Sequence, residues 1–302
     1  NYNLNFSKNG EVVFFSKKAS NAPAPDMAHD RAKRWLLDPA APWLHALGIA
    51  SANGEVYANA HDKWRQINKY LEIAESLLRE RPLPPDAHIA DMGSGKGYLT
   101  FALYDFLKNK LNMTPSITGI ELRKNLVDLC EKTAQQAGFD GLHFIAQNIE
   151  DYRPERLDML IALHACDTAT DLALAVGIRH AAKIIVAAPC CHKQIRKEMQ
   201  TRNELAPLMQ HGILEERQAE IVTDGIRALL LEAQGYKTNV FEFISTEHTA
   251  KNVMITATLD KKRATNSAAS SQKRTAALEK VAAIKTGFGI KEHHLEKLLG
   301  EQ

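Results

Sequence analysis

Cysteine is scarce in this chain, which has four cysteines among 302 residues. Small secreted domains stabilised by disulfides carry far more, so a disulfide scaffold is excluded and a reducing, cytoplasmic compartment is expected. Long apolar runs are also missing, since no stretch reaches the roughly 18–20 apolar residues that cross a bilayer. The start of the chain lacks the pattern of a signal peptide. The first residue is Asn1, so we expect a fragment of a longer domain.

An excess of one charge sign is absent too, because 38 Lys and Arg face 36 Asp and Glu, giving a net charge of +2. The distribution along the chain is uneven. Residues 1–37 carry six basic and three acidic side chains, and residues 261–302 carry nine basic and four acidic ones. The net charge of the segment between them is therefore −6. Basic ends around an acidic core fit a protein whose flanks contact phosphate groups. Solubilising tails are the alternative interpretation, since charge runs are often only solvated.

The N-terminal part of the sequence predicts small elements ahead of one long helix. Alternating residues around Asn9-Gly10 are typical of a β-hairpin over 3–17. Short helices are expected over 27–37 and 41–49. Apolar residues at helical spacing predict a helix over 61–80, and the prolines that follow end it.

Strands and helices alternate from residue 88 onward, which predicts an α/β fold with a parallel sheet covered on both faces. The expected strands span 88–92, 116–121, 142–146, 158–163, 183–188, 237–245 and 252–259. The expected helices span 97–109, 123–137, 169–180, part of 193–209, and 224–234. No long helix separates the last two strands, so they are expected to be antiparallel. The expected domains are an N-terminal hairpin and helices (1–58), the α/β domain (59–260), and a basic linker with a helical tail (261–302).

A glycine-rich loop follows the first strand of this sheet, in the segment HIADMGSGKG at 88–97. Glycines allow positive φ and a close approach of backbone to a ligand, and the next helix points its amide groups at the loop. The register is Asp91-x-Gly93-x-Gly95-x-Gly97, which is neither the dinucleotide fingerprint GxGxxG nor a P-loop. It resembles motif I of the S-adenosylmethionine (SAM)-dependent methyltransferases. The resemblance implies SAM as cofactor and a Rossmann-like sheet of seven strands.

Residues at the next strand ends complete the expected cofactor site. Glu121 ends the second strand, where an acid is placed to accept both ribose hydroxyls of an adenosine. Gln147 and Asn148 follow the third strand, where an amide can read the adenine edge, although they are also suited to capping the next element. Lys63 and Gln66 are candidates to meet the carboxylate of the methionine end. The remaining expected cofactor residues are Ser94, Tyr98, Leu122 and Leu163.

Two motifs follow the fourth and fifth expected strands, LHACD at 163–167 and PCCHK at 189–193. In open α/β sheets, chemistry lies outside the carboxyl ends of the strands. Behind DMGSGKG, these motifs resemble the methyltransferase family that includes the eukaryotic tRNA acceptor-stem ribose 2′-O-methyltransferases, over roughly residues 60–260. EHTAKN at 247–252 resembles bacterial members of that group. The candidate catalytic residues are His164, Asp167, Cys190, His192 and Lys193.

A ribose hydroxyl is a poor nucleophile near neutral pH, so its methylation calls for a base that takes the proton. His164, His192 and Asp167 are candidates for the base, with Asp167 also able to orient a histidine. Lys193 is a candidate to bind a phosphate or to lower the pKa of the hydroxyl. His164 is also suited to a structural role beside the cofactor or as a helix cap.

Cysteine chemistry gives two alternatives at the same strand ends. Cys190 or Cys191 can act as the nucleophile of a methyltransferase that modifies a carbon of a pyrimidine base, or can be a small buried apolar residue. A tetrahedral metal site made from the histidines and cysteines of both motifs is the second alternative. Adjacent cysteines and H-x-C spacing are not usual for structural zinc, so no metal is expected.

The sequence therefore predicts a SAM-dependent methyltransferase that acts on RNA, either tRNA or rRNA, with no membrane partner. Trp35, Trp43 and Trp64 lie among cationic residues, as in proteins that stack bases and hold phosphates, although tryptophans also fasten helices to a domain. A methyltransferase for a protein or a small molecule is the main alternative. A non-catalytic RNA-binding module is a third hypothesis, which the intact glycine loop opposes.

Overall fold

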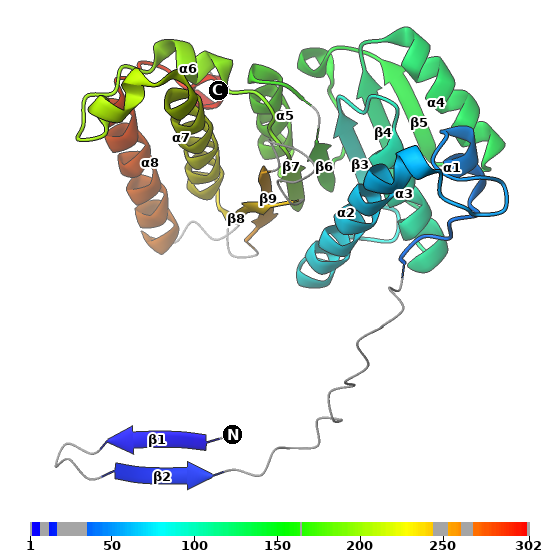
Figure 1. The fold of residues 1–302 in the computed structure, drawn as a ribbon, viewed down its shortest axis with the longest axis horizontal. Coiled ribbons are helices and arrows are strands. Elements are labelled where there is room, and N and C mark those ends of the chain that lie inside the picture. Colours follow the sequence, from blue (N-terminus) through cyan, green and yellow to red (C-terminus); the bar gives the residue numbers. More distant parts are fainter. Residues whose placement is uncertain are drawn as a thin grey trace. The chain divides into compact units, whose positions relative to one another are not determined.

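The computed structural model describes residues 2–6, 12–16, 35–163, 165–243, 253–260 and 268–300 (Figure 1). The chain divides into two units, residues 1–34 and 35–302. In the first unit, β1 (Tyr2–Phe6) and β2 (Val12–Ser16) pair in antiparallel register, which confirms the predicted hairpin strands. The turn at Asn9-Gly10 lies outside the described residues, as does most of the helix predicted over 27–37.

The second unit is built on a seven-stranded sheet with the order β5-β4-β3-β6-β7-β9-β8. Its strands are β3 (His88–Met92), β4 (Ser116–Glu121), β5 (Leu142–Ala146), β6 (Met159–Ala162), β7 (Ile184–Ala187), β8 (Tyr236–Glu242) and β9 (Val253–Leu259). The first five run parallel, and β9 runs antiparallel to both of its neighbours. The predicted fold class, including the antiparallel final pair, is confirmed.

Helices cover both faces of this sheet (Figure 1). They are α1 (Pro42–Ala46), α2 (His61–Glu80), α3 (Tyr98–Asp105), α4 (Lys124–Gln136), α5 (Thr168–Arg179), α6 (Lys193–Glu198), α7 (Gly212–Ala233), α8 (Ala268–Phe288) and α9 (His294–Gly300). Short helical turns are η1 (Ala58–Ala60), η2 (Phe106–Lys110, π-helical), η3 (Ile149–Asp151) and η4 (Ala206–Gln210).

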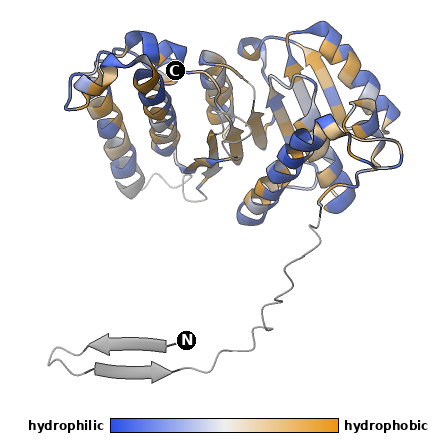
Figure 2. Ribbon diagram, viewed as in Figure 1, coloured by the Kyte–Doolittle hydropathy of each residue, from blue (hydrophilic) through white to orange (hydrophobic). Residues whose placement is uncertain are grey.

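Two hydrophobic cores lie on opposite faces of the sheet, because successive strand side chains point to opposite sides. Ile184 and Val186 of β7 belong to the core that α1 to α4 cover, whereas Ile185 and Ala187 belong to the core under α5, α7, α8 and α9. Figure 2 shows the central strands in hydrophobic colours between helices of mixed hydropathy. Strands buried on both faces read as continuous apolar runs, which is why the sequence shows them clearly.

Differences from the predicted elements fall mainly at helices. Residues 35–37 are not helical, and α1 is shorter than predicted because the chain turns at Gly48, which has a φ of +72°. Instead of one helix in 193–209, the chain forms α6, an irregular stretch and η4. The helix predicted over 224–234 begins at Gly212, since ion pairs from Arg196 to Glu215 and Glu216 hold its polar first half against α6.

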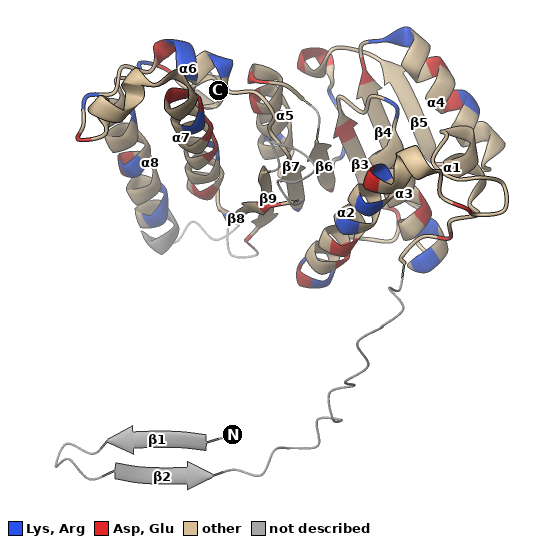
Figure 3. Ribbon diagram, viewed as in Figure 1, with Lys and Arg blue, Asp and Glu red and all other residues tan. Residues whose placement is uncertain are grey.

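The C-terminal helices pack on the rest of the second unit. Helix α8 lies beside α7, and α9 contacts α5 (Figure 1). Part of the polar linker expected over 261–275 is helical, because α8 begins at Ala268. Figure 3 shows acidic and basic residues interspersed along α2, α7 and α8. None of the described helices is long and apolar enough to cross a membrane.

Candidate active site

A pocket of about 410 Å³ opens at the carboxyl ends of β3, β4, β5 and β6. The chain order of the sheet reverses between β3 and β6, and open α/β sheets bind ligands at this switch point. Many predicted cofactor residues line the pocket: Lys63, Asp91, Gly93, Ser94, Gly95, Tyr98, Glu121, Leu122, Gln147, Asn148 and Leu163. Gly97 and Gln66 lie beside it, and Cys166 of the LHACD motif also lines it. Lys96 and Arg123 are lining residues that the sequence analysis did not predict for the cofactor site.

The glycine loop is fixed by hydrogen bonds to the neighbouring strand. The amides of Gly93 and Ser94 both donate to the carbonyl of Ile120 on β4, at 2.8 and 3.0 Å. Gly93, Gly95 and Gly97 all have positive φ, which side chains with a Cβ rarely adopt. A Cβ on Gly97 would also lie 3.0 Å from the ring of Phe144. The loop therefore exposes backbone to the pocket at a position where only glycine fits.

Asp91 is the buried acid of the pocket. Its side chain is 4% exposed, and the hydroxyl of Thr100 donates to it at 2.5 Å. Burial raises the pKa of Asp91 from 3.8 to about 6, with the charge of Glu121 adding to the shift and the Thr100 bond opposing it. A carboxylate in this position favours a cationic ligand group, such as the ammonium of SAM.

Glu121 lies opposite, at the end of β4, and all of its acceptor positions are filled. Its carboxylate accepts from the amide of Gly95 at 3.0 Å and from the amide, Nε and Nη2 of Arg123 at 3.0, 2.8 and 3.0 Å. The hydrogen bonds from Arg123 hold the pKa of Glu121 below its usual value. A carboxylate offers about four acceptor sites, so ribose hydroxyls reach Glu121 only by replacing the Arg123 side chain.

Lys63 reaches the pocket from α2. Its ammonium donates to Gln66 at 2.7 Å and lies 5.4 Å from the centroid of the Tyr98 ring at the start of α3. Burial lowers the pKa of Lys63. The geometry is that of a cation held at the pocket edge by a neutral partner, where it is available to a carboxylate. Gln66 is not among the lining residues and contacts Lys63 beside the pocket.

The adenine side of the predicted site is open and apolar. Leu122 is 70% exposed although it lines the pocket, as expected for a side chain that covers a flat ring. Asn148 lines the pocket and also caps η3, since its Oδ1 accepts from the amide of Glu150 at 3.4 Å. The capping alternative for Asn148 is thus seen in the structure, and its Nδ2 is a separate group suited to an adenine nitrogen.

Asp167 lies where β6 leads into α5 and has a strained backbone, with a φ of +55°. Two contacts hold this conformation: Arg227 donates to the Asp167 carbonyl at 2.9 Å, and the amide of Gln194 donates to its Oδ1 at 3.2 Å. Strain of this kind persists only where surrounding structure enforces it and often marks functional positions. Cys166 and Ala169, on either side, line the pocket. His164 lies outside the described residues.

His192 does not line the pocket. It is 5% exposed, and its Nε2 lies 3.1 Å from Asp224 in a buried charge network on α7. Arg227 connects this network, with bonds to Asp224 at 3.1 Å and to both oxygens of Asp171 at 2.8 and 3.0 Å. The sequence prediction of a catalytic His192 finds no support in this geometry, because the imidazole faces away into the fold. Lys193 is exposed at the start of α6.

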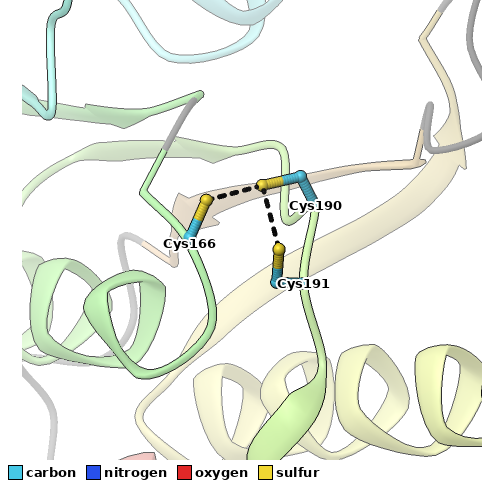
Figure 4. A group of neighbouring side chains, drawn as sticks. All are labelled: Cys166, Cys190 and Cys191. Carbon is cyan, nitrogen blue, oxygen red and sulfur yellow. Dashed lines mark hydrogen bonds between the residues drawn. The ribbon is translucent and has the colours of Figure 1, made fainter.

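Three thiols gather where β6 and β7 end. The sulfur of Cys190 lies 3.1 Å from that of Cys166 and 3.8 Å from that of Cys191 (Figure 4). Burial and the neighbouring Cys166 raise the pKa of Cys190 to about 12, which disfavours a thiolate at neutral pH. Neither Cys190 nor Cys191 is fully buried, so the interpretation of either as a core residue is wrong.

Two of the three tryptophans are core residues. Trp43 is fully buried, stacks on Phe101 with centroids 5.8 Å apart, and donates to Asp105 at 2.7 Å. Trp64 is 3% exposed, so neither indole is available to stack a base. Trp35 is 36% exposed and contacts Trp64. The hypothesis of base stacking is therefore wrong for Trp43 and Trp64.

Comparison with known proteins agrees with this geometry. Residues 62–198 match the family model described as a methyltransferase domain. The glutathione S-transferase C-terminal domain-containing protein of Homo sapiens is 27% identical over 185 residues, covering 60% of this chain and 24% of that protein. Its Mus musculus counterpart is 31% identical over 132 residues, covering 43% and 19%. The chain thus spans a quarter or less of the length of these curated relatives.

Solved structures of methyltransferases match this chain at low identity. Magnesium protoporphyrin IX methyltransferase from Synechocystis, with bound SAH, has a TM-score of 0.44 at 14% identity, covering 72% of this chain and 93% of that one. An rRNA methylase from Streptococcus thermophilus has a TM-score of 0.40 at 11% identity, covering 63% and 96%.

The pocket also fits SAM on its own terms. It offers backbone amides on a glycine loop, a buried acid, a second acid at the end of β4 and an exposed apolar side chain, which are groups suited to SAM. A methyltransferase-domain model thus matches the segment from α2 to α6, and the sheet order and the pocket are those expected of a SAM-dependent methyltransferase.

Proposed function

We propose that this chain methylates RNA, a tRNA or rRNA, at a ribose 2′-hydroxyl in the cytoplasm. The observation that carries the proposal is the contact of the LHACD segment, which reaches the pocket through Cys166, with the chain that directly follows PCCHK. Cys166 lines the pocket, and the carboxylate of Asp167 accepts from Gln194, the residue after PCCHK. These motifs resemble those of ribose 2′-O-methyltransferases of tRNA. The basic ends, +3 over residues 1–37 and +5 over 261–302, supply charge suited to phosphates.

The residues in and beside the pocket then have defined tasks. When bound, SAM supplies an electrophilic methyl group on a sulfonium. Lys63 holds the carboxylate of its methionine end, Asp91 its ammonium, and Glu121 its ribose. Asp167 takes the proton of the acceptor hydroxyl while the new carbon–oxygen bond forms and the sulfur–carbon bond breaks. Two hydrogen bonds already fix Asp167, and its second carboxylate oxygen is the one assigned to the proton.

A base-carbon methyltransferase with Cys190 as nucleophile is less well supported. The thiol has a pKa of about 12 and contacts two other sulfurs, so little thiolate is present at neutral pH. A protein or small-molecule acceptor is the remaining alternative, and it differs from RNA in its response to ribonuclease.

The experiment is transfer of tritium-labelled methyl from SAM to total RNA from a strain that lacks the gene, followed by nucleoside mass spectrometry. The expected product is a 2′-O-methylnucleoside, absent with Glu121→Ala, which removes the ribose acceptor. Label on a base carbon would contradict the ribose assignment. The RNA proposal would be refuted if the tritium label were found in protein or small molecules, were unaffected by ribonuclease and were absent from RNA.

A further inference from the structure

The thiol cluster of Cys166, Cys190 and Cys191 lies at the mouths of two neighbouring parallel strands (Figure 4). Cys166 follows β6, and Cys190 and Cys191 follow β7. All three sulfurs lie within 4.8 Å of one another, with two separations of 3.1 and 3.8 Å. Among the described residues, no other group of His, Cys, Asp and Glu side chains converges in this way.

These separations are those of ligands around one soft cation. Zinc–sulfur bonds of about 2.3 Å in tetrahedral geometry place the sulfurs about 3.8 Å apart. To reach this separation, the sulfurs of Cys166 and Cys190 must move apart by well below an ångström. The sulfurs of Cys190 and Cys191 need almost no shift. Pro189 is buried just before the pair and restricts the backbone that presents both thiols. Sequence spacing argues against a metal because Cys190 and Cys191 are adjacent, yet both of their sulfurs lie within 4.8 Å of the Cys166 sulfur.

We propose that Cys166, Cys190 and Cys191 bind one Zn²⁺ as a three-thiolate site whose fourth position faces the cofactor pocket. Cys166 is exposed and lines that pocket, so the open position adjoins the place where the acceptor meets the methyl group. Binding replaces the thiol protons, which pass to solvent, and no oxidant or reductant is needed. The ion joins the mouths of β6 and β7, and its fourth position takes water or a donor atom of the acceptor. A catalytic zinc typically has three protein ligands and one open position of this kind.

The first test measures metal on the intact chain under reducing conditions. Protein purified with reductant, incubated with Zn²⁺ and desalted, is expected to retain one equivalent by mass spectrometry of metals. Substitution by Co²⁺ is expected to give a sulfur-to-cobalt charge-transfer band with the intensity of three thiolates. Protein that retains no stoichiometric metal, or a cobalt spectrum without thiolate ligands, would overturn the proposal.

The second test places the metal at these sulfurs. Cys166→Ser, Cys190→Ser and Cys191→Ser should each weaken Zn²⁺ binding at least tenfold in competition with a chelator. Cys130→Ser is the matched control, because Cys130 lies on α4, is buried, and contacts the Gly95 carbonyl instead of the cluster. It is expected to keep the metal. Cys166 is exposed, so Cys166→Ser leaves the core unchanged and its far-ultraviolet circular dichroism checks folding. Full metal retention by Cys166→Ser would show that the ion sits elsewhere.

These measurements do not depend on methyl transfer. A chain that binds Zn²⁺ through the three thiols but labels no RNA would keep the site and refute the RNA proposal. A chain that methylates RNA but retains no zinc would keep the RNA proposal and refute the metal site.

Discussion

Asp91 should make SAM affinity depend on pH. Burial raises the pKa of Asp91 to about 6. The ammonium of SAM stays protonated and its carboxylate stays ionised from about pH 5 to 7, so Asp91 is the group that titrates in this range. If the ammonium binds the ionised Asp91, SAM competes with the proton for one carboxylate. The fraction of ionised Asp91 falls from about nine tenths at about pH 7 to about a tenth at about pH 5, so the apparent Kd should rise roughly tenfold.

Asp91→Asn removes this titration while it keeps the shape of the side chain. The variant should bind SAM more weakly at about pH 7, and its Kd should no longer change between about pH 5 and 7. Isothermal titration calorimetry across this range measures both quantities. Asp86→Asn is the matched control, because Asp86 precedes the same strand, outside the pocket lining, and its variant should follow the native pH profile. An Asp91→Asn profile as steep as the native one would refute the assignment.

The same pKa shift gives a prediction for folding with a definite sign. A carboxyl whose folded pKa is raised from 3.8 to about 6 contributes stability that is fully present below about pH 3.8 and lost as the pH rises through 6. Asp91→Asn should therefore stabilise the cofactor-free chain at neutral pH, by at most about 3 kcal/mol for two pKa units. Urea unfolding at two pH values measures it, and a destabilised variant at neutral pH would contradict the direction.

Three other changes test neighbouring contacts. Arg123→Met frees the Glu121 carboxylate, so calorimetry should show SAM binding about two- to fivefold more tightly, which is the scale of an exposed ion pair. Weaker binding would mean that Arg123 itself holds the cofactor. Asp167→Asn should lower kcat at least about 10²-fold with an unchanged Kd for SAM, as expected for loss of a base, and an unchanged kcat in labelled transfer would exclude that role. Arg227→Met leaves Asp171 and Asp224 buried without their partner and should cost about 3–5 kcal/mol in urea unfolding, whereas a loss below about 1 kcal/mol would show that water reaches the network.

The parts of the fold that local pattern controls were predictable from sequence. β3, β4 and β5 match their predicted bounds. β3 is buried over four of its five residues, whereas β5, at the edge of the sheet, alternates between buried and more exposed residues. The start of α7 was missed because its first half is polar and depends on α6 through Arg196. The basic tail gave no sign that α8 and α9 pack on α7 and α5, since that contact depends on distant segments.

The candidate site shows the same difference between features set by local sequence and features set by distant contacts. Asp91, Glu121 and the glycines were found because backbone conformation and strand ends restrict those positions. The competition of Arg123 for Glu121 was missed, although an arginine two residues after the acid is a usable signal. The burial of His192 depends on Asp224, 32 residues away, and the meeting of three thiols depends on strand order; neither is a property of local spacing.

The most direct test of the SAM site is a calorimetric titration of the chain with SAM, compared with the Glu121→Ala variant. The native chain should bind one SAM per chain, and Glu121→Ala should weaken the binding at least about tenfold because the ribose loses its acceptor. Absence of SAM binding by the native chain, or equal affinity in the variant, would contradict the assignment of this pocket.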